Sequence, residues 1–196
     1  MRNINDRFIK LTTGISLLFL CSFLSCKKNI EFDELRQFMK KRIKIPTKQL
    51  NQKSCYLYTP DSIGLRNVNI IHIIKMGDCT GCVAETAASI EKKGYGRKKR
   101  KNISDVFIII TDSTLEETVY KELCRARIKG IVYLDTCNAF IQANPTFPVS
   151  FTFRTFVMRK DGKVLLVGDP FKNEKMEQLF LKVIDKEKQR RTNEDI

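Results

Sequence analysis

The fold of this chain is decided by residues 69–82, which read NIIHIIK from 69 to 75 and MGDCTGC from 76 to 82. In the first half, apolar side chains occupy both alternating sets of positions, which is typical of a strand covered by helices on both faces. After Cys82 the apolar residues recur at helical spacing, at Val83, Ala84, Ala87, Ala88 and Ile90. A buried strand therefore leads into a helix at the pair Cys79-Thr80-Gly81-Cys82.

Further strands and helices alternate downstream of the cysteines. The apolar runs at residues 106–110 and 131–135 predict two more buried strands. Between them, Ser113-Thr114-Leu115-Glu116 has the pattern of a capping box, which opens a helix that we expect to run to about Ile128. Gly130 is expected to close this helix.

A hairpin and a final helix complete the pattern. Residues 151–158 and 163–167 flank Asp161-Gly162, a residue pair favoured in tight turns, and are expected to pair as two strands. The last helix carries one apolar stripe, formed by Met176, Leu179, Phe180, Val183 and Ile184. This alternation of strands and helices predicts an α/β sandwich around a mixed sheet.

The chain has room for one domain, with shorter segments at both ends. Apolar residues between 32 and 43 follow helical spacing, and residues 43–46 suggest a short strand. We expect the following division: signal peptide at 1–25, anchor and N-terminal extension at 26–53, domain at 54–187, and frayed charged tail at 188–196.

In this order of elements, residues 54–187 resemble the thioredoxin superfamily, in particular its TlpA-like, redoxin-type branch of membrane-anchored lipoproteins. The resemblance rests on a Cys-x-x-Cys between strand and helix, on residues 155–158 leading into Asp161-Gly162-Lys163, and on the amphipathic final helix. It implies a thioredoxin-like three-layer α/β/α sandwich with a mixed central sheet. It also implies a thiol-disulfide oxidoreductase that needs no cofactor and whose partners are protein thiols or disulfides.

The resemblance assigns roles to the two cysteines and to a facing loop. Cys79 is expected at the N-terminus of a helix, where unpaired backbone N–H groups and the helix dipole stabilise a thiolate. It would be the nucleophile, and Cys82, one turn along, the resolving cysteine. The substrate-facing loop would be formed by Phe153, Arg154 and Thr155. The superfamily has a cis-proline in this loop; because Phe153 or Arg154 stands there instead, we expect a trans peptide bond.

Two other interpretations of the cysteine pair remain open. The superfamily commonly has an aromatic residue before the first cysteine, whereas this chain has Gly77-Asp78, and an ionised Asp78 would oppose the Cys79 thiolate. The protein could therefore be a lipid-anchored binding or sensing module in which the pair is a structural staple. Cys79, Cys82 and His72 could also offer ligands to copper or zinc. Since His72 lies in mid-strand among isoleucines, we interpret it as a sheet residue and predict no metal site.

The first 26 residues carry the pattern of an exported, lipid-anchored bacterial protein. Arg2, Arg7 and Lys10 precede a charge-free apolar stretch, residues 11–24, that is too short to span a membrane. The following Ser25-Cys26 resembles the lipobox of bacterial lipoproteins, whose cysteine is diacylated and becomes the new first residue. The resemblance implies a lipid such as palmitate on Cys26 and a location in the cell envelope, facing the periplasm. An ordinary signal peptide cleaved nearby is the alternative.

Composition narrows the class of partner. The chain has 36 Lys and Arg residues against 22 Asp and Glu, a net charge of +14, which favours anionic partners. Its densest basic run, residues 97–101, would suggest nucleic-acid binding in an intracellular protein, but export excludes that function. We interpret the run as a solvated loop and expect no nucleic-acid partner, only protein thiols or disulfides and a membrane held through Cys26.

The chain has seven cysteines. With Cys21 in the signal peptide and Cys26 lipidated, five remain, so in an oxidising compartment at least one thiol is left unpaired within the monomer. Cys55 lies in a strand-like stretch and Cys124 in a helical pattern, and we interpret both as small buried hydrophobes. The sequence does not decide whether Cys55, Cys124 and Cys137 pair.

Overall fold

The computed structural model describes residues 33–53, 65–75, 77, 79–93, 103–148 and 153–194. The chain divides into two compact units, Met1–Phe38 and Met39–Ile196. The described part of the first unit is helical, in agreement with the expected helical spacing, and this helix ends at residue 40. Among the described residues, no helix combines the length and the apolar character needed to cross a membrane. The sheet and the cysteine pair belong to the second unit.

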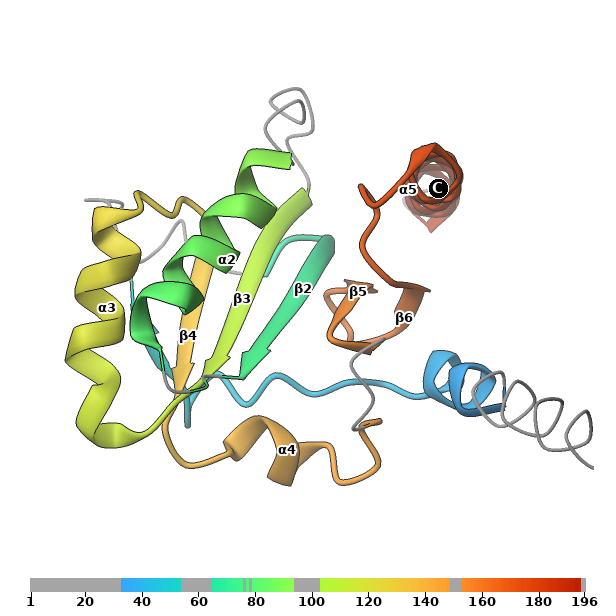
Figure 1. Ribbon diagram of the computed structural model, residues 1–196. Coiled ribbons are helices and arrows are strands. Elements are labelled where there is room, and N and C mark those ends of the chain that lie inside the picture. Colours follow the sequence, from blue (N-terminus) through green and yellow to red (C-terminus); the bar gives the residue numbers. More distant parts are fainter. Residues whose placement is uncertain are drawn as a thin grey trace, which may run out of the picture. The chain divides into compact units, whose positions relative to one another are not determined.

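In the second unit, the described residues form a six-stranded mixed sheet in the order β1-β4-β3-β2-β5-β6 (Figure 1). The strands are β1 (Asn51–Lys53), β2 (Val68–Lys75), β3 (Ile103–Ile110), β4 (Ile131–Asp135), β5 (Thr155–Arg159) and β6 (Val164–Val167). β2, β3 and β4 are parallel, while β1 pairs antiparallel with β4, β5 with β2, and β6 with β5. The strands expected around residues 69–75, 106–110 and 131–135 are confirmed.

Three helices cover one face of this sheet: α2 (Thr80–Lys93), α3 (Glu116–Arg125) and α5 (Glu174–Glu194). α2 and α3 lie side by side and pack on a core that includes Phe107 of β3 (Figure 1). Phe180 and Ile184 of α5 pack on Ile70 of β2. Ile70 points to the same side of β2 as His72, and His72 pairs in register with Phe107, so all three helices share one face.

The opposite face is covered by α4 (Ala139–Ala143) and the residues that follow it. Phe140 of α4 contacts Phe147, with ring centroids 5.2 Å apart, and Phe147 contacts Phe156 of β5 at 6.0 Å. Phe156 neighbours Val157, which packs against α5 on the other face, so the side chains of β5 alternate between two layers. The three-layer α/β/α sandwich around a mixed sheet, predicted from the sequence, is therefore confirmed.

Several element boundaries differ from those expected. Residues 51–53, placed in the N-terminal extension, form β1 of the sheet. Residues 43–46 are not a strand; instead the Ile43 N–H donates to the Gly162 carbonyl oxygen at 2.8 Å, where Gly162 turns the β5–β6 hairpin with a φ of 88°. The tail expected to fray from residue 188 is helical, because α5 continues to Glu194.

The helix after β3 also begins and ends differently. Asp112, and not the expected capping box, caps its first turn, a 3-10 segment at Ser113–Leu115, through a 2.8 Å bond from the Thr114 N–H to its side chain. α3 ends at Arg125, and Arg127 adopts a left-handed φ of 57°. Gly130 is required for another reason: a Cβ there would lie 2.6 Å from the Phe107 ring.

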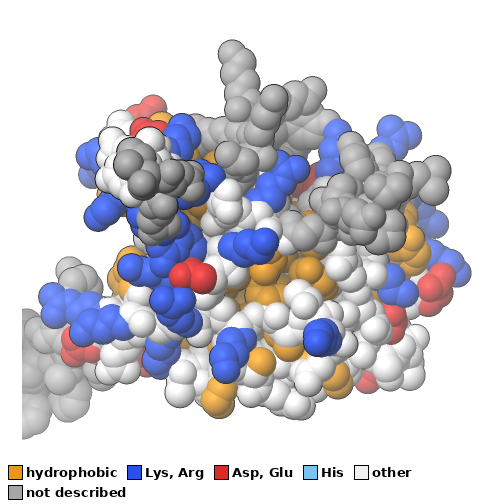
Figure 2. Space-filling model, turned by 180° about the vertical axis from the view of Figure 1, so that it is seen from behind, with side chains coloured by type: hydrophobic (Ala, Val, Ile, Leu, Met, Phe, Trp, Pro, Cys, Tyr) orange, Lys and Arg blue, Asp and Glu red, His pale blue; other side chains and the backbone are white. Residues whose placement is uncertain are grey.

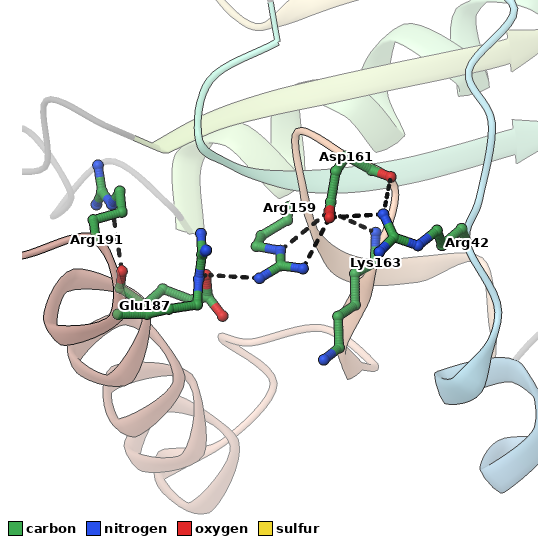
Figure 3. A network of polar contacts seen from close by, with 7 residues as sticks. Arg42, Arg159, Asp161, Lys163, Glu187 and Arg191 are labelled. Atoms are coloured by element: carbon green, nitrogen blue, oxygen red, sulfur yellow. Dashed lines mark hydrogen bonds and ion pairs between the residues drawn. The ribbon is translucent and has the colours of Figure 1, made fainter. Parts of the chain in front are cut away.

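The β5–β6 hairpin is tied to α5 and to the segment before β1 by ion pairs (Figure 3). Asp161 receives the guanidinium groups of Arg42 and Arg159, each at 2.8 Å, and Arg159 lies 3.9 Å from Glu187 of α5. Burial opposes ionisation of Asp161, but hydrogen bonds from Arg159 and Lys163 and the charges of Arg159 and Arg42 outweigh it. The pKa of Asp161 is therefore lowered.

A lowered pKa makes the contribution of Asp161 to stability dependent on pH. In the folded state the carboxylate binds its proton less readily than in the unfolded chain, so its contribution is present above pH ~4 and disappears as the pH falls through the lowered value. We expect Asp161→Asn to reduce the free energy of unfolding by about 1 kcal/mol at pH 7, since the pair is part-exposed, and by less at pH 3. Urea denaturation at both pH values measures this difference.

Asp185→Asn, which removes a more exposed ion pair with Lys188, is the control. An equal loss at both pH values for Asp161→Asn would contradict the expectation.

Candidate functional site at the end of β2

The cysteine pair lies where the central strand gives way to a helix. β2 ends at Lys75, and α2 begins at Thr80, directly after Cys79. Cys79 and Cys82 form a disulfide with their Cα atoms 5.4 Å apart, and both residues are exposed. The expected placement of the pair between strand and helix is confirmed.

The start of α2 provides the electrostatic setting for Cys79. The backbone N–H of Cys82 donates to the Cys79 sulfur at 3.1 Å. The first turn of a helix leaves its N–H groups without intrahelical partners, and their dipoles favour a negative charge placed there. The first turn of α2 contains no acidic residue, and Asp78, which we expect to oppose the thiolate, lies outside the described residues. When the pair is reduced, these groups favour the thiolate of Cys79 over that of Cys82.

α2 is held in place at both its ends. Near the cysteines, Val83, Ala84 and Ala87 are buried in the core shared with α3. Near its C-terminus, the Glu91 carboxylate accepts the backbone N–H groups of Lys129 and Gly130, just before β4. Burial, aided by the charge of Asp105, raises the pKa of Glu91 even though the two N–H groups oppose this. The cysteine pair therefore sits on a helix with little freedom to shift.

The expected substrate-facing loop does lie beside the last half of β2. The Ile73 N–H donates to the Arg154 carbonyl oxygen at 2.8 Å, and Thr155 pairs in register with His72. Peptide bonds among residues 153–155 are trans. The Phe153 side chain is buried, whereas Arg154 and Thr155 are part-exposed. Residues 149–152, which precede them, lie outside the described part of the chain.

His72 is committed to the sheet and does not join the cysteines. It is 2% exposed, and its ring stacks on Phe107 with centroids 5.0 Å apart. Its Nδ1 lies 3.4 Å from Thr155 Oγ1 and its Nε2 lies 3.4 Å from Asp105 Oδ1. Within the described residues, no group of three or more His, Cys, Asp and Glu side chains is arranged to hold a metal ion. These contacts support the interpretation of His72 as a sheet residue.

The remaining cysteines differ from one another. Cys124 is disulfide-bonded and part-exposed, so the interpretation of this residue as a buried hydrophobe was wrong: Val119 and Leu123 are the residues of α3 that are fully buried. Cys137 is the one free cysteine that the structure describes, and it is exposed. Cys26 and Cys55 lie outside the described residues.

The position of Cys137 was not singled out by sequence reasoning. It follows β4 by two residues, and β4 is parallel to β2, so Cys137 lies at the same end of the sheet as Cys79. Its sulfur is 4.0 Å from a side-chain oxygen of Asp135. Its place directly after a buried parallel strand was the available signal, because the carboxyl ends of parallel strands meet at one edge of the sheet.

Comparison with known proteins shows likeness in structure only. No family model and no curated protein matches the chain. A solved structure of an uncharacterised thioredoxin-like protein from Porphyromonas gingivalis is 14% identical, with 61% of this chain and 74% of that chain covered and a TM-score of 0.40.

Two further solved structures are similar to the same degree. A putative thiol:disulfide interchange protein DsbE from Chlorobium tepidum is 18% identical, with 61% and 81% covered and a TM-score of 0.42. The thioredoxin domain of a thiol-disulfide oxidoreductase from Bacteroides vulgatus is 13% identical, with 61% and 84% covered and a TM-score of 0.43. With TM-scores this low, we base the function of this chain on its own residues.

The hydrogen bond between Cys82 N–H and the Cys79 sulfur predicts unequal reactivity. In the reduced protein, Cys79 should have the lower pKa and should alkylate faster than Cys82 at neutral pH, because only the thiolate reacts. Mass spectrometry after brief iodoacetamide treatment at a series of pH values measures both rates. Cys137, exposed and not part of the pair, is the internal reference. Equal rates at Cys79 and Cys82, or a faster Cys82, would contradict this division of roles.

Proposed function

We propose that this protein is a thiol-disulfide oxidoreductase of the cell envelope that acts through Cys79 and Cys82. The observation that carries the proposal is an exposed disulfide whose first sulfur accepts a backbone N–H at the start of a 14-residue helix. A purely structural disulfide needs neither exposure nor a thiolate-stabilising position. Both features serve exchange with another molecule.

The exchange follows from the two positions. In the reducing direction, the Cys79 thiolate attacks one sulfur of a partner's disulfide, forms a mixed disulfide and releases the partner's other sulfur as a thiolate. The Cys82 thiolate then attacks the Cys79 sulfur, which closes the Cys79–Cys82 bond and releases the second partner thiolate. Two electrons pass from the pair to the partner. The oxidised pair performs the same steps in reverse and oxidises two partner thiols.

The substrate class follows from the surroundings of the pair. Both sulfurs belong to exposed residues, so a disulfide or thiol on the surface of another protein can reach them. The part-exposed Arg154 and Thr155 lie on the neighbouring strand end and offer polar contacts to an approaching polypeptide. We therefore propose protein thiols or disulfides as substrates, with Cys79 as nucleophile and Cys82 as resolving cysteine.

The proposed location rests on the N-terminal sequence. Ser25-Cys26 follows the apolar stretch 11–24 as in a bacterial lipoprotein, and we propose that Cys26 carries the lipid that anchors the protein in the envelope, facing the periplasm. An oxidising compartment also suits a chain in which Cys79, Cys82 and Cys124 are disulfide-bonded. Residues 1–32 lie outside the described part of the structure.

A resolving-cysteine variant tests the redox function. Cys82→Ala should accumulate mixed disulfides between Cys79 and partner proteins, because the thiol that releases the partner is absent. Non-reducing gels of envelope extracts, followed by mass spectrometry of the trapped bands, detect these species. Cys82→Ala combined with Cys79→Ala is the matched control and should show none of them. Mixed disulfides of equal yield in both variants would show that another cysteine, such as Cys137, forms them. If neither variant formed mixed disulfides, the Cys79–Cys82 bond would be a structural disulfide and the redox function would be contradicted.

A substitution at Cys26 tests the anchor. Cells grown with a clickable fatty-acid analogue should label the wild-type protein, and Cys26→Ser should abolish the label by removing the acylated sulfur. Cys21→Ser, five residues earlier in the apolar stretch, is the control and should keep the label. Labelling that persists in Cys26→Ser would contradict lipid attachment at this residue.

A further inference from the structure

The far end of the sheet from the cysteines is unusually basic. β5 runs antiparallel to β2, so Thr155 lies beside His72 near the cysteine end, and Arg159 lies beside Val68 at the start of β2. At about 3.3 Å per residue, the eight residues of β2 separate these two ends by roughly 23 Å. The turn that follows Arg159 is therefore remote from the redox pair.

A basic hollow of about 250 Å³ opens beside this turn. Its lining includes four cationic side chains, against only two carboxylates, which leaves a surplus of two positive charges. The cations come from the hairpin and from α5: Arg159, Lys160, Arg190 and Arg191. A hollow of this size and charge fits an anionic group such as a phosphate.

The two carboxylates hold the arginines in position. Asp161 binds Arg159 through both Nε and a terminal nitrogen, at 3.1 and 2.8 Å. On α5, the Nε of Arg190 donates to the Glu187 carboxylate at 3.2 Å, and the Nε of Arg191 donates to the Glu187 backbone oxygen at 3.3 Å (Figure 3). Guanidinium groups fixed in this way lose little conformational entropy when an anion binds.

A second, larger hollow of about 720 Å³ lies on the other side of the turn and shares Lys160 and Asp161 with the first. Its walls are polar and apolar in nearly equal parts, with Lys44 and Lys160 beside the part-exposed Ile45. Figure 2, which shows the molecule from behind, has Lys and Arg side chains gathered around exposed apolar ones. A basic hollow that adjoins one of mixed polar and apolar character suits the interfacial region of a membrane, where anionic headgroups meet the acyl chains.

We propose that this end of the protein, defined by the basic hollow and the adjoining mixed hollow, binds the surface of a membrane that contains anionic phospholipids. Phosphate groups would occupy the basic hollow, and part-exposed apolar residues of the mixed hollow, such as Ile45, would face the acyl boundary of the leaflet. Bound in this way, the protein presents Cys79 and Cys82 away from the membrane, toward partner proteins. The proposal goes beyond the redox function and does not depend on it.

Vesicle flotation tests the proposal with the full chain carrying Cys26→Ser, so that no lipid is attached. Vesicles of phosphatidylcholine with phosphatidylglycerol are compared with vesicles of phosphatidylcholine alone, because any contribution of the apolar stretch 11–24 is common to both. Removing one charge near an anionic surface weakens binding about fivefold. Lys160→Gln and Arg191→Gln should each show this loss on anionic vesicles, and the double variant about a thirtyfold loss. Binding to phosphatidylcholine alone should not change.

Lys121→Gln is the matched control, since Lys121 is an equally cationic, exposed residue on α3. It should bind anionic vesicles as the parent does, and all variants should unfold at the parent's temperature. Wild-type binding by the double variant would overturn the proposal, as would an equal loss in Lys121→Gln. If millimolar inorganic phosphate displaced the protein from anionic vesicles as effectively as added unlabelled anionic vesicles do, the proposal would also be overturned, in favour of a site for a free anion. Cys82→Ala should bind vesicles normally, so failure of the redox function leaves this result unaffected.

Discussion

The structure depends on the burial of β2 between two strands and two helical layers. All eight of its residues pair with β3 on one side, and its first five pair with β5 on the other. Ile70 and Ile71 point to opposite faces with no exposure to solvent. A strand held in this way cannot shift its register without exposing apolar side chains. The end of β2 at Lys75 is therefore fixed in space, and Cys79 follows it four residues later in the sequence. The position of the cysteine pair therefore depends on the fixed register of β2.

The two ends of the sheet differ in the kind of charge that they carry. At the cysteine end, backbone N–H groups at the start of α2 favour a thiolate on Cys79. At the other end, carboxylates such as Asp161 and Glu187 hold several arginines close together, a geometry that mutual repulsion would otherwise oppose. The ion-pair cluster around Asp161 and Glu187 thus lies roughly one strand length away from the cysteine pair. The two surfaces can be altered independently by mutation.

The sequence allowed elements with a long apolar periodicity to be predicted. It did not allow the prediction of elements whose boundaries or bonding are fixed by single contacts. The β2 to α2 transition and the order of strands and helices were predictable because burial on one or two faces imposes clear patterns. α4 was missed because five residues carry too little periodicity, and its start is fixed by the Asp135 carboxylate, which accepts the N–H groups of Ala139 and Phe140 at 2.8 and 2.9 Å. The disulfide state of Cys124 could not be predicted either, because pairing is set by spatial proximity between distant segments.

The packing of α5 has a consequence for how the protein is made. Phe180 and Ile184 cover Val68, Ile70 and Val157, so the apolar face of the central strands stays open until the last part of the chain has left the ribosome. A nascent chain that lacks residues 174–184 cannot complete this core, whereas the core formed by β3, β4, α2 and α3 contains no residue of α5. A helix that comes late in the sequence thereby sets when the second part of the core can close during synthesis.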